Sequence, residues 1–192
     1  MKNLVEFIIP TYNRTEPLRA MLASLMAQTD SDWHATVIQD GTETEDAFKI
    51  VSSFYDNRIN CYATERRYND WGHTPREIGK QQSEADYIIM TGDDNYYTPN
   101  FVAELRVAKE LGKNPGMIYW DMVHSHYQYQ FFKCQLGNNQ IDMGAFATRN
   151  DLAKQIQLGK EFDADGIFVV NYLKKFPKEN NHKIHKVLFI HN

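Results

Sequence analysis

Short β-rich runs alternate with amphipathic helical patterns along the first third of the chain, and this alternation constrains the fold more than any other feature. The β-rich runs lie at 5–9, 36–38 and 59–63, and helical spacing of apolar residues occupies 15–26 and 44–55. This order predicts an α/β fold with a doubly wound, mostly parallel central sheet and helices on both faces. Ligands of such sheets bind at the carboxyl ends of the strands.

The rest of the chain is less regular and predicts a small antiparallel extension of the sheet. Further strands are predicted at 87–90, 117–123, 141–148 and 184–190, and helices at 99–111, 150–158 and 165–175. The polar stretch 65–84 shows no apolar period and carries no predicted element.

The length and composition indicate one ordinary globular domain. The chain has 192 residues, of which 42% are hydrophobic and 24% charged, and it contains no repeat or linker. The formal net charge is −4 and the basic residues are scattered, so we expect no nucleic-acid partner. A nucleotide would have to be held by local chemistry.

Targeting and cysteine signals are absent from the sequence. Cys61 and Cys134 lie far apart and in no metal-ligand spacing, which predicts neither a disulfide nor a zinc site. No apolar run reaches the roughly 20 residues that span a bilayer, and no signal-peptide pattern precedes the first strand. We therefore expect no transmembrane segment and a cytoplasmic location.

Two adjacent carboxylates, Asp93 and Asp94, directly follow the apolar strand predicted at 87–90. Neighbouring like charges repel, so such a pair favours a bound cation, and hard oxygen ligands suit Mg²⁺ or Mn²⁺. The alternative is an Asp-rich turn that caps the next helix. The loops 10–14 and 40–41 are expected at the same sheet edge, where a nucleotide could lie across all three loops.

Four segments together resemble family 2 glycosyltransferases with the A-type fold. They read FIIPTYNR, SLMAQTDSDWHATVIQDG, ADYIIMTGDDNYYTPNF and IDMGAFATR, and the resemblance is closest to small bacterial members whose metal motif is Asp-Asp-Asn. It implies a single domain over 1–192, with a nucleotide-binding half at 1–98 and an acceptor and catalytic half at 99–192. It also implies an inverting, metal-dependent transfer of sugar from a nucleotide-sugar, with uridine favoured, to a saccharide or other hydroxyl acceptor.

The resemblance places the donor nucleotide against the loops that follow the strands. Arg76 is expected near the phosphates or sugar, with a surface salt bridge as its alternative, and Gln39 departs from the usual paired acids and weakens the uracil preference. The side chains that the resemblance assigns to the nucleotide are Pro10, Thr11, Tyr12, Arg14, Asp40, Arg76 and Asp93.

The metal in this family would be Mn²⁺ or Mg²⁺, bound to the donor diphosphate. Asp94 resembles the chelating residue, and His191 resembles a third ligand found in some relatives, although a frayed tail is its alternative. The cation would offset the negative charge on the departing nucleotide.

An inverting transfer needs a carboxylate that removes the acceptor's proton, and three candidates lie in the second half of the chain: Asp142, Asp163 and Asp165. The family places its base at the start of the helix after the IDMGAFATR-like strand, which selects Asp165. A helix N-cap is the better interpretation of Asp163.

Sugar contacts are expected around Gly144, whose small size allows a sugar to approach the backbone, and at the neighbouring Asp142, for which a strand-edge turn is the alternative. Trp71, Trp120 and the aromatic run 127–132 are candidates for an acceptor platform, because sugars stack on aromatic faces; core packing is the alternative.

Two other functions compete with transfer. A nucleotidyltransferase would share the sheet and the acids, but it would carry a Gly-rich basic loop where this chain has 10–14. A non-catalytic nucleotide-sugar-binding module would retain the pocket and lack a base, whereas Asp165 is present.

Overall fold

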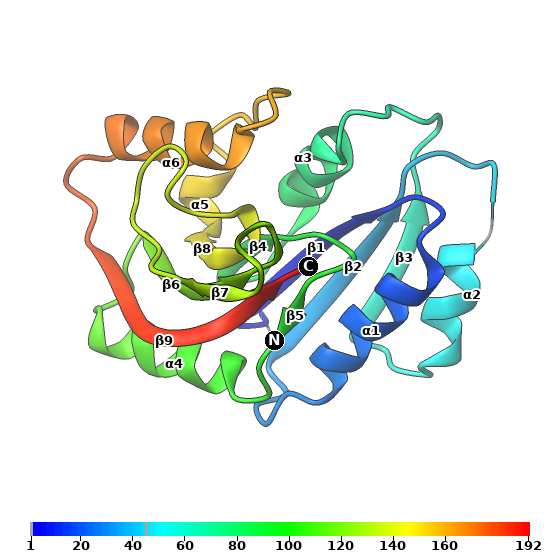
Figure 1. Ribbon diagram of the computed structural model, residues 1–192, viewed down its shortest axis with the longest axis horizontal. Coiled ribbons are helices and arrows are strands. Elements are labelled where there is room, and N and C mark those ends of the chain that lie inside the picture. The colour runs from blue at the N-terminus through cyan, green and yellow to red at the C-terminus, as the bar shows by residue number, and fades with distance from the viewer. Residues whose placement is uncertain (1, 45) are drawn as a thin grey trace.

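The computed structural model describes residues 2–44 and 46–192, and Figure 1 shows a curved central sheet between two layers of helices. The strands are β1 (Val5–Thr11), β2 (Trp33–Gln39), β3 (Ile59–Ala63), β4 (Tyr87–Met90), β5 (Tyr96–Tyr97), β6 (Met117–His124), β7 (Gln130–Phe132), β8 (Phe146–Arg149) and β9 (Asn181–His191). The helices are α1 (Thr15–Met26), α2 (Asp46–Ser53), α3 (His73–Gln82), α4 (Phe101–Leu111), α5 (Asn150–Ala153) and α6 (Ala164–Lys175), with short 3₁₀ turns η1 (Ser125–Tyr127) and η2 (Met143–Ala145).

The sheet has the predicted mixed character. Its strand order is β3-β2-β1-β4-β8-β6-β9-β5, with β7 paired to β6 outside this path. β1 pairs in parallel with β2 and β4, and β2 pairs in parallel with β3. The antiparallel pairs all involve the second half of the chain, because β8 runs against both β4 and β6, and β7 runs against β6. The predicted fold class is therefore confirmed.

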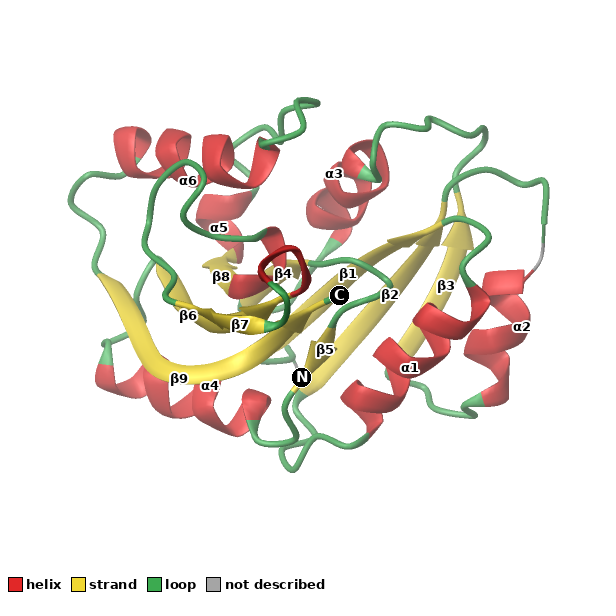
Figure 2. Ribbon diagram, viewed as in Figure 1, coloured by secondary structure: helices red, strands yellow, loops and turns green. Residues whose placement is uncertain are grey.

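The two faces of the sheet are covered by different helices, as Figure 2 shows: α1, α2 and α4 on one face and α3, α5 and α6 on the other. Successive residues of β1 point to opposite faces, as in any strand. Phe7 packs on Phe101 of α4 with a ring separation of 5.9 Å, whereas Ile8 lies against Gly79 of α3. A strand buried on both faces reads as a near-continuous apolar run. β1 has this pattern except at the buried Glu6, whose carboxylate accepts a hydrogen bond from Thr36 of β2.

Helix α3 is the element that the sequence pattern missed, since it lies in the stretch 65–84 for which no element was predicted. Its buried positions include His73, Pro75, Gly79 and Lys80, so burial is not marked by apolar residues. Lys80 is fully buried, where it pairs with Glu77 at 2.7 Å and donates to the backbone oxygen of Ile156.

Other elements also differ from the prediction. The strand expected at 141–148 begins at Phe146, because the Asp142 side chain accepts a hydrogen bond from the Gly144 amide and starts the turn η2. Helix α5 ends at Ala153 rather than at 158, and the short strand β5 was not predicted. The helix predicted at 44–55 is α2, which begins at Asp46; residue 45 lies outside the described residues.

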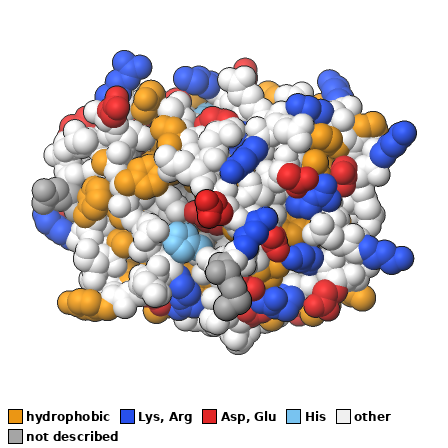
Figure 3. Space-filling model, turned by 180° about the vertical axis from the view of Figure 1, so that it is seen from behind, with side chains coloured by type: hydrophobic (Ala, Val, Ile, Leu, Met, Phe, Trp, Pro, Cys, Tyr) orange, Lys and Arg blue, Asp and Glu red, His pale blue; other side chains and the backbone are white. Residues whose placement is uncertain are grey.

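No helix among residues 2–44 and 46–192 is long and apolar enough to cross a membrane. Figure 3 shows basic and acidic side chains interspersed over the face turned away from the viewer in Figure 1. That face has the mixed charge expected from the scattered basic residues of the sequence.

Candidate functional site

The loops that follow β1, β2 and β4 meet at one end of the sheet, because these three strands are parallel neighbours. Together with the loop before α3 they line a cavity of about 260 Å³, which we call the first cavity. Eight of the predicted site residues line it: Pro10, Thr11, Tyr12, Arg14, Asp40, Arg76, Asp93 and Asp94. The structure thus brings the whole predicted nucleotide set together with Asp94.

The two adjacent carboxylates are held by the loop that follows β1. Thr11 donates from its hydroxyl to Asp93 at 2.7 Å, and Arg14 lies 2.7 Å from Asp94 and 3.4 Å from Asp93. Burial raises the pKa of Asp93 to about 6, against the opposing effects of Thr11 and Arg14. A carboxylate kept at this energetic cost is typical of a functional site rather than of a solvated turn.

Asp40 holds the loop between β3 and α3 in place. Its two carboxylate oxygens accept hydrogen bonds from the backbone amides of Tyr68 at 2.8 Å and Asn69 at 2.9 Å. This fixes the loop so that the guanidinium of Arg67 lies over the Tyr12 ring, 3.6 Å from its centroid. The stacked pair forms part of the cavity wall.

Sequence reasoning gave no role to four residues that line the first cavity, Arg67, Asn69, Gly72 and Gly92, and it assigned Trp71 to the acceptor platform instead. Asn69 and Trp71 have positive φ angles of 53° and 54°, and Gly72 has 79°. A Cβ at Gly72 would lie 2.7 Å from the Pro10 ring, so only glycine allows this close approach. The Trp-Gly pair at the start of a helix was the available signal, although it is weak without a recognised helix.

Arg76 lies between this cavity and a second group of acids. From α3 it donates to the backbone oxygens of Thr91 at 3.1 Å and Trp71 at 2.8 Å. Burial lowers the pKa of Arg76, and the nearby carboxylates oppose this shift; in order of effect they are Asp142, Asp93, Asp94 and Asp165. A single guanidinium therefore faces acids from both halves of the chain.

A second cavity, of about 320 Å³, opens where the end of β6, the start of α6 and the end of β9 come together. It is lined by Met122, His124, His126, Tyr127, Phe132, Asn139, Ile141, Asp142, Phe162, Asp163, Asp165 and His191. The three acids considered as catalytic bases thus share one cavity.

Asp165 has the environment of a base within this cavity. Burial, and next the charge of Asp142, raise its pKa to about 6, while the Gly166 amide donates to its carboxylate at 2.6 Å and opposes the shift. Asp163 instead accepts a hydrogen bond from Asn138 at 3.0 Å, and its side chain makes no cap of α6. Asp163 therefore occupies the predicted N-cap position of α6, but its side chain does not make the capping hydrogen bond.

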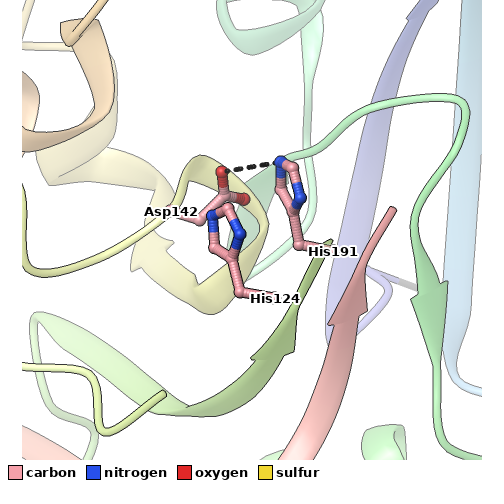
Figure 4. Close-up of side chains that lie close together, drawn as sticks. All are labelled: His124, Asp142 and His191. Carbon is pink, nitrogen blue, oxygen red and sulfur yellow. Dashed lines mark ion pairs between the residues drawn. The ribbon is translucent and has the colours of Figure 1, made fainter. Parts of the chain in front are cut away.

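His124, Asp142 and His191 point toward one another from β6, the start of η2 and the end of β9, as Figure 4 shows. Their ligand atoms lie within 4.8 Å of one another, and the Nε2 of His191 is 3.7 Å from Asp142. The imidazole rings of His124 and His191 stack with centroids 4.0 Å apart. Other polar atoms of the same side chains have hydrogen-bond partners. The Ser125 hydroxyl lies 3.0 Å from the Nδ1 of His191, and the Gly144 amide donates to the Asp142 carboxylate.

Two residues expected at sugar contacts are buried in the core. Trp120 is fully buried and packs edge-on against Phe101 with centroids 4.7 Å apart, so the acceptor role predicted for Trp120 is wrong. Gly144 is buried, and a Cβ there would lie 2.4 Å from the Phe189 ring. Its small size is required by packing, whether or not a sugar approaches.

The model of the family described as glycosyl transferase family 2 matches residues 6–133, which is more than half of the chain. The chain belongs to this family. The matched span runs from β1 to the strand after β6, and therefore includes every lining residue of the first cavity.

Curated relatives of this family 2 chain are longer proteins. It is 25% identical over 116 residues to the UDP-Glc:alpha-D-GlcNAc-diphosphoundecaprenol beta-1,3-glucosyltransferase WfgD of Escherichia coli, a match that covers 60% of this chain and 44% of the relative. The chain spans less than half the length of the first curated relatives that it matches.

Solved structures support the fold over almost the whole chain. S. aureus TarS 1–349 in complex with UDP-GlcNAc superposes with a TM-score of 0.78 at 16% identity, covering 99% of this chain and 58% of that one. The mannosyltransferase PcManGT from Pyrobaculum calidifontis, in complex with GDP-Man and Mn²⁺, gives a TM-score of 0.74 at 12% identity, covering 99% and 57%. The family 2 chain therefore has the A-type fold that the sequence motifs implied.

The side chains of this family 2 member fit a divalent cation. Carboxylate oxygens and imidazole nitrogens are suitable ligands for Mn²⁺. Among the described residues, the single group of three such ligand atoms within 4.8 Å is His124, Asp142 and His191. Asp94 is not part of that group and is engaged by Arg14.

Proposed function

We propose that this chain is an inverting, metal-dependent glycosyltransferase that moves a sugar from a nucleotide-sugar, with UDP as the favoured nucleotide, to an acceptor hydroxyl. The observation that carries the proposal is the position of Asp165. This carboxylate has a raised pKa and lines the second cavity, and its charge acts on Arg76, which lines the predicted nucleotide site.

The division of the chain supports separate donor and acceptor sites. All lining residues of the first cavity lie within 1–98, and all those of the second lie within 99–192. We assign the nucleotide to the first cavity, with Tyr12 and Arg67 beside the base and ribose and with Arg14 and Arg76 facing the diphosphate. Guanidinium groups suit this role because they make paired hydrogen bonds to phosphate oxygens.

A divalent cation, Mn²⁺ or Mg²⁺, would be held by His191, which belongs to the three-ligand group, and by Asp94 of the first cavity, with Asp93 toward the ribose or a metal-bound water. When bound, it would offset the negative charge that develops on the departing nucleoside diphosphate. The Mn²⁺ complex of the mannosyltransferase with the same fold is consistent with this assignment.

Asp165 would act as the general base. As the acceptor oxygen attacks the anomeric carbon, its proton passes to the Asp165 carboxylate, and the bond from that carbon to the diphosphate oxygen breaks on the opposite side. The configuration of the sugar is inverted as a result. A base with a pKa near 6 accepts a proton more readily than an ordinary aspartate and is still ionised at neutral pH.

The proposal is tested first by calorimetry with UDP-, GDP- and dTDP-sugars, with and without Mn²⁺. We expect one nucleotide to bind in a metal-dependent manner and Asp94→Ala to lose that binding. Asp46→Ala, at the exposed start of α2, is a control that should bind as the unaltered protein does. If no nucleotide-sugar binds, the family and fold stand and the proposed activity is wrong.

A further inference from the structure

The second cavity has a charge pattern that restricts what can enter it. Asp142, Asp163 and Asp165 all line it, and none of its described lining residues is a lysine or arginine. The first cavity, in contrast, is lined by Arg14, Arg67 and Arg76. A phosphate or carboxylate group would meet matching cations in the first cavity and like charges in the second.

An exposed aromatic pair stands where the two cavities meet. Trp71 lines the first cavity and is 67% exposed, and Phe162 lines the second and is 82% exposed. Their rings meet edge-on at 6.5 Å. A hydrogen-bond contact of 3.1 Å between His73 and the Glu161 backbone oxygen ties the segments that carry the two rings together.

Exposed rings beside a polar cavity suit a sugar. The apolar C–H face of a pyranose stacks on an aromatic ring, while carboxylates and imidazoles accept hydrogen bonds from its hydroxyls. A divalent cation held by Asp94 and His191 would be matched by the charge of the donor diphosphate. Asp163 and Asp165 lie outside the three-ligand group, so their negative charges would still repel an anionic acceptor.

We infer that the second cavity selects an uncharged sugar or amino sugar as the acceptor, stacked on Phe162, and discriminates against a uronate or phosphate beside the attacked hydroxyl. This inference rests on the proposed glycosyltransferase function and names its acceptor class.

The test compares acceptors whose terminal sugars differ in the charge of one substituent. With the donor identified by calorimetry and Mn²⁺ present, transfer is measured to oligosaccharides that end in glucose, glucosamine, glucuronate or glucose 6-phosphate, and to the corresponding galactose series. We expect kcat/KM at least about tenfold higher for the neutral or amino acceptor than for its anionic counterpart. A preference for the anionic member of a pair would overturn the inference.

The stacking role is tested by Phe162→Ala. We expect the acceptor KM to rise about tenfold with the donor Kd unchanged, and Phe162→Tyr to restore the KM. Phe48→Ala is the matched control, because Phe48 is also an exposed phenylalanine, at 36%, but lines neither cavity. Equal acceptor KM values for Phe162→Ala and Phe48→Ala would contradict a stacking role.

Two further outcomes distinguish a failure of this inference from a failure of the proposed glycosyltransferase function. If the donor binds and is slowly hydrolysed but no saccharide of either charge is glycosylated, the acceptor class is wrong while the donor assignment stands. If no donor binds, the proposed function itself fails.

Discussion

The two cavities balance charge in opposite ways. In the first, the carboxylates Asp93 and Asp94 are paired with Arg14, and Arg67 and Arg76 add further positive charge. Burial raises the pKa of one carboxyl in each cavity to about 6, but Arg14 opposes this shift at Asp93, whereas the negative Asp142 adds to it at Asp165. We propose that the arginines of the first cavity suit a phosphate and that the second cavity suits proton transfer.

The largest expected effect comes from Asp165→Asn, which removes the proposed general base from the second cavity. Loss of the base should lower kcat by about 10³-fold, which is within the usual range for general base catalysis, while the donor Kd changes little. Steady-state kinetics and calorimetry check the two parts. Asp46→Asn, at a residue that lines neither cavity, should keep normal kcat. Retention of turnover in Asp165→Asn would remove Asp165 from the mechanism.

Arg76→Gln tests the boundary between the cavities. The donor Kd should rise by about 10- to 30-fold, because one guanidinium that faces the diphosphate is lost while the surrounding acids remain. Calorimetry in the presence of Mn²⁺ measures the change, and Arg58→Gln, whose native partner is Asp56, is the matched control. An unchanged donor Kd would place the diphosphate elsewhere.

The pH dependence of kcat/KM should follow the raised pKa of Asp165. The base acts only when ionised, so activity should be constant above about pH 7 and fall as the pH drops through about 6, reaching roughly one tenth of its plateau near pH 5. The pH profile must be recorded at saturating Mn²⁺, since Asp93 also has a pKa of about 6. A profile that is flat down to pH 5 would contradict this assignment.

The smallest expected effect is that of Asp165→Asn on the free energy of unfolding. The pKa of Asp165 is higher in the folded chain than the usual value of about 4 in an unfolded one, so the folded state binds more protons between these values and loses stability as the pH rises through them. Asp165→Asn should therefore be more stable than the unaltered protein by about 1–2 kcal/mol at pH 8, and no more stable near pH 3. Urea unfolding at the two pH values checks this, and a gain that persists at pH 3 would need another cause.

The sequence predicted the fold well where apolar periodicity is strong. Strand β4 is a continuous apolar run, and β1 is a run of buried residues interrupted by Glu6. The loops after them supplied the first-cavity residues because parallel neighbours end at the same sheet edge. Helix α3 was missed since its buried face contains His73 and the charged Lys80, which no apolar pattern reveals.

Side-chain environments were harder to predict than positions along the chain. Trp120 and Phe162 are both large aromatic residues, yet the first is fully buried and the second is exposed beside a cavity, and only packing separates them. The proximity of His124 to His191 depends on the parallel pairing of β6 with β9, two strands far apart in sequence. The local pattern of apolar residues in each strand does not predict that β6 pairs with β9.

The most direct test of the account is a crystal structure of Asp165→Asn with the bound nucleotide-sugar and Mn²⁺. The account predicts the nucleotide in the first cavity between Tyr12 and Arg76, with the anomeric carbon of the sugar facing the second cavity and residue 165. A nucleotide bound in the second cavity, or a sugar directed away from residue 165, would contradict it.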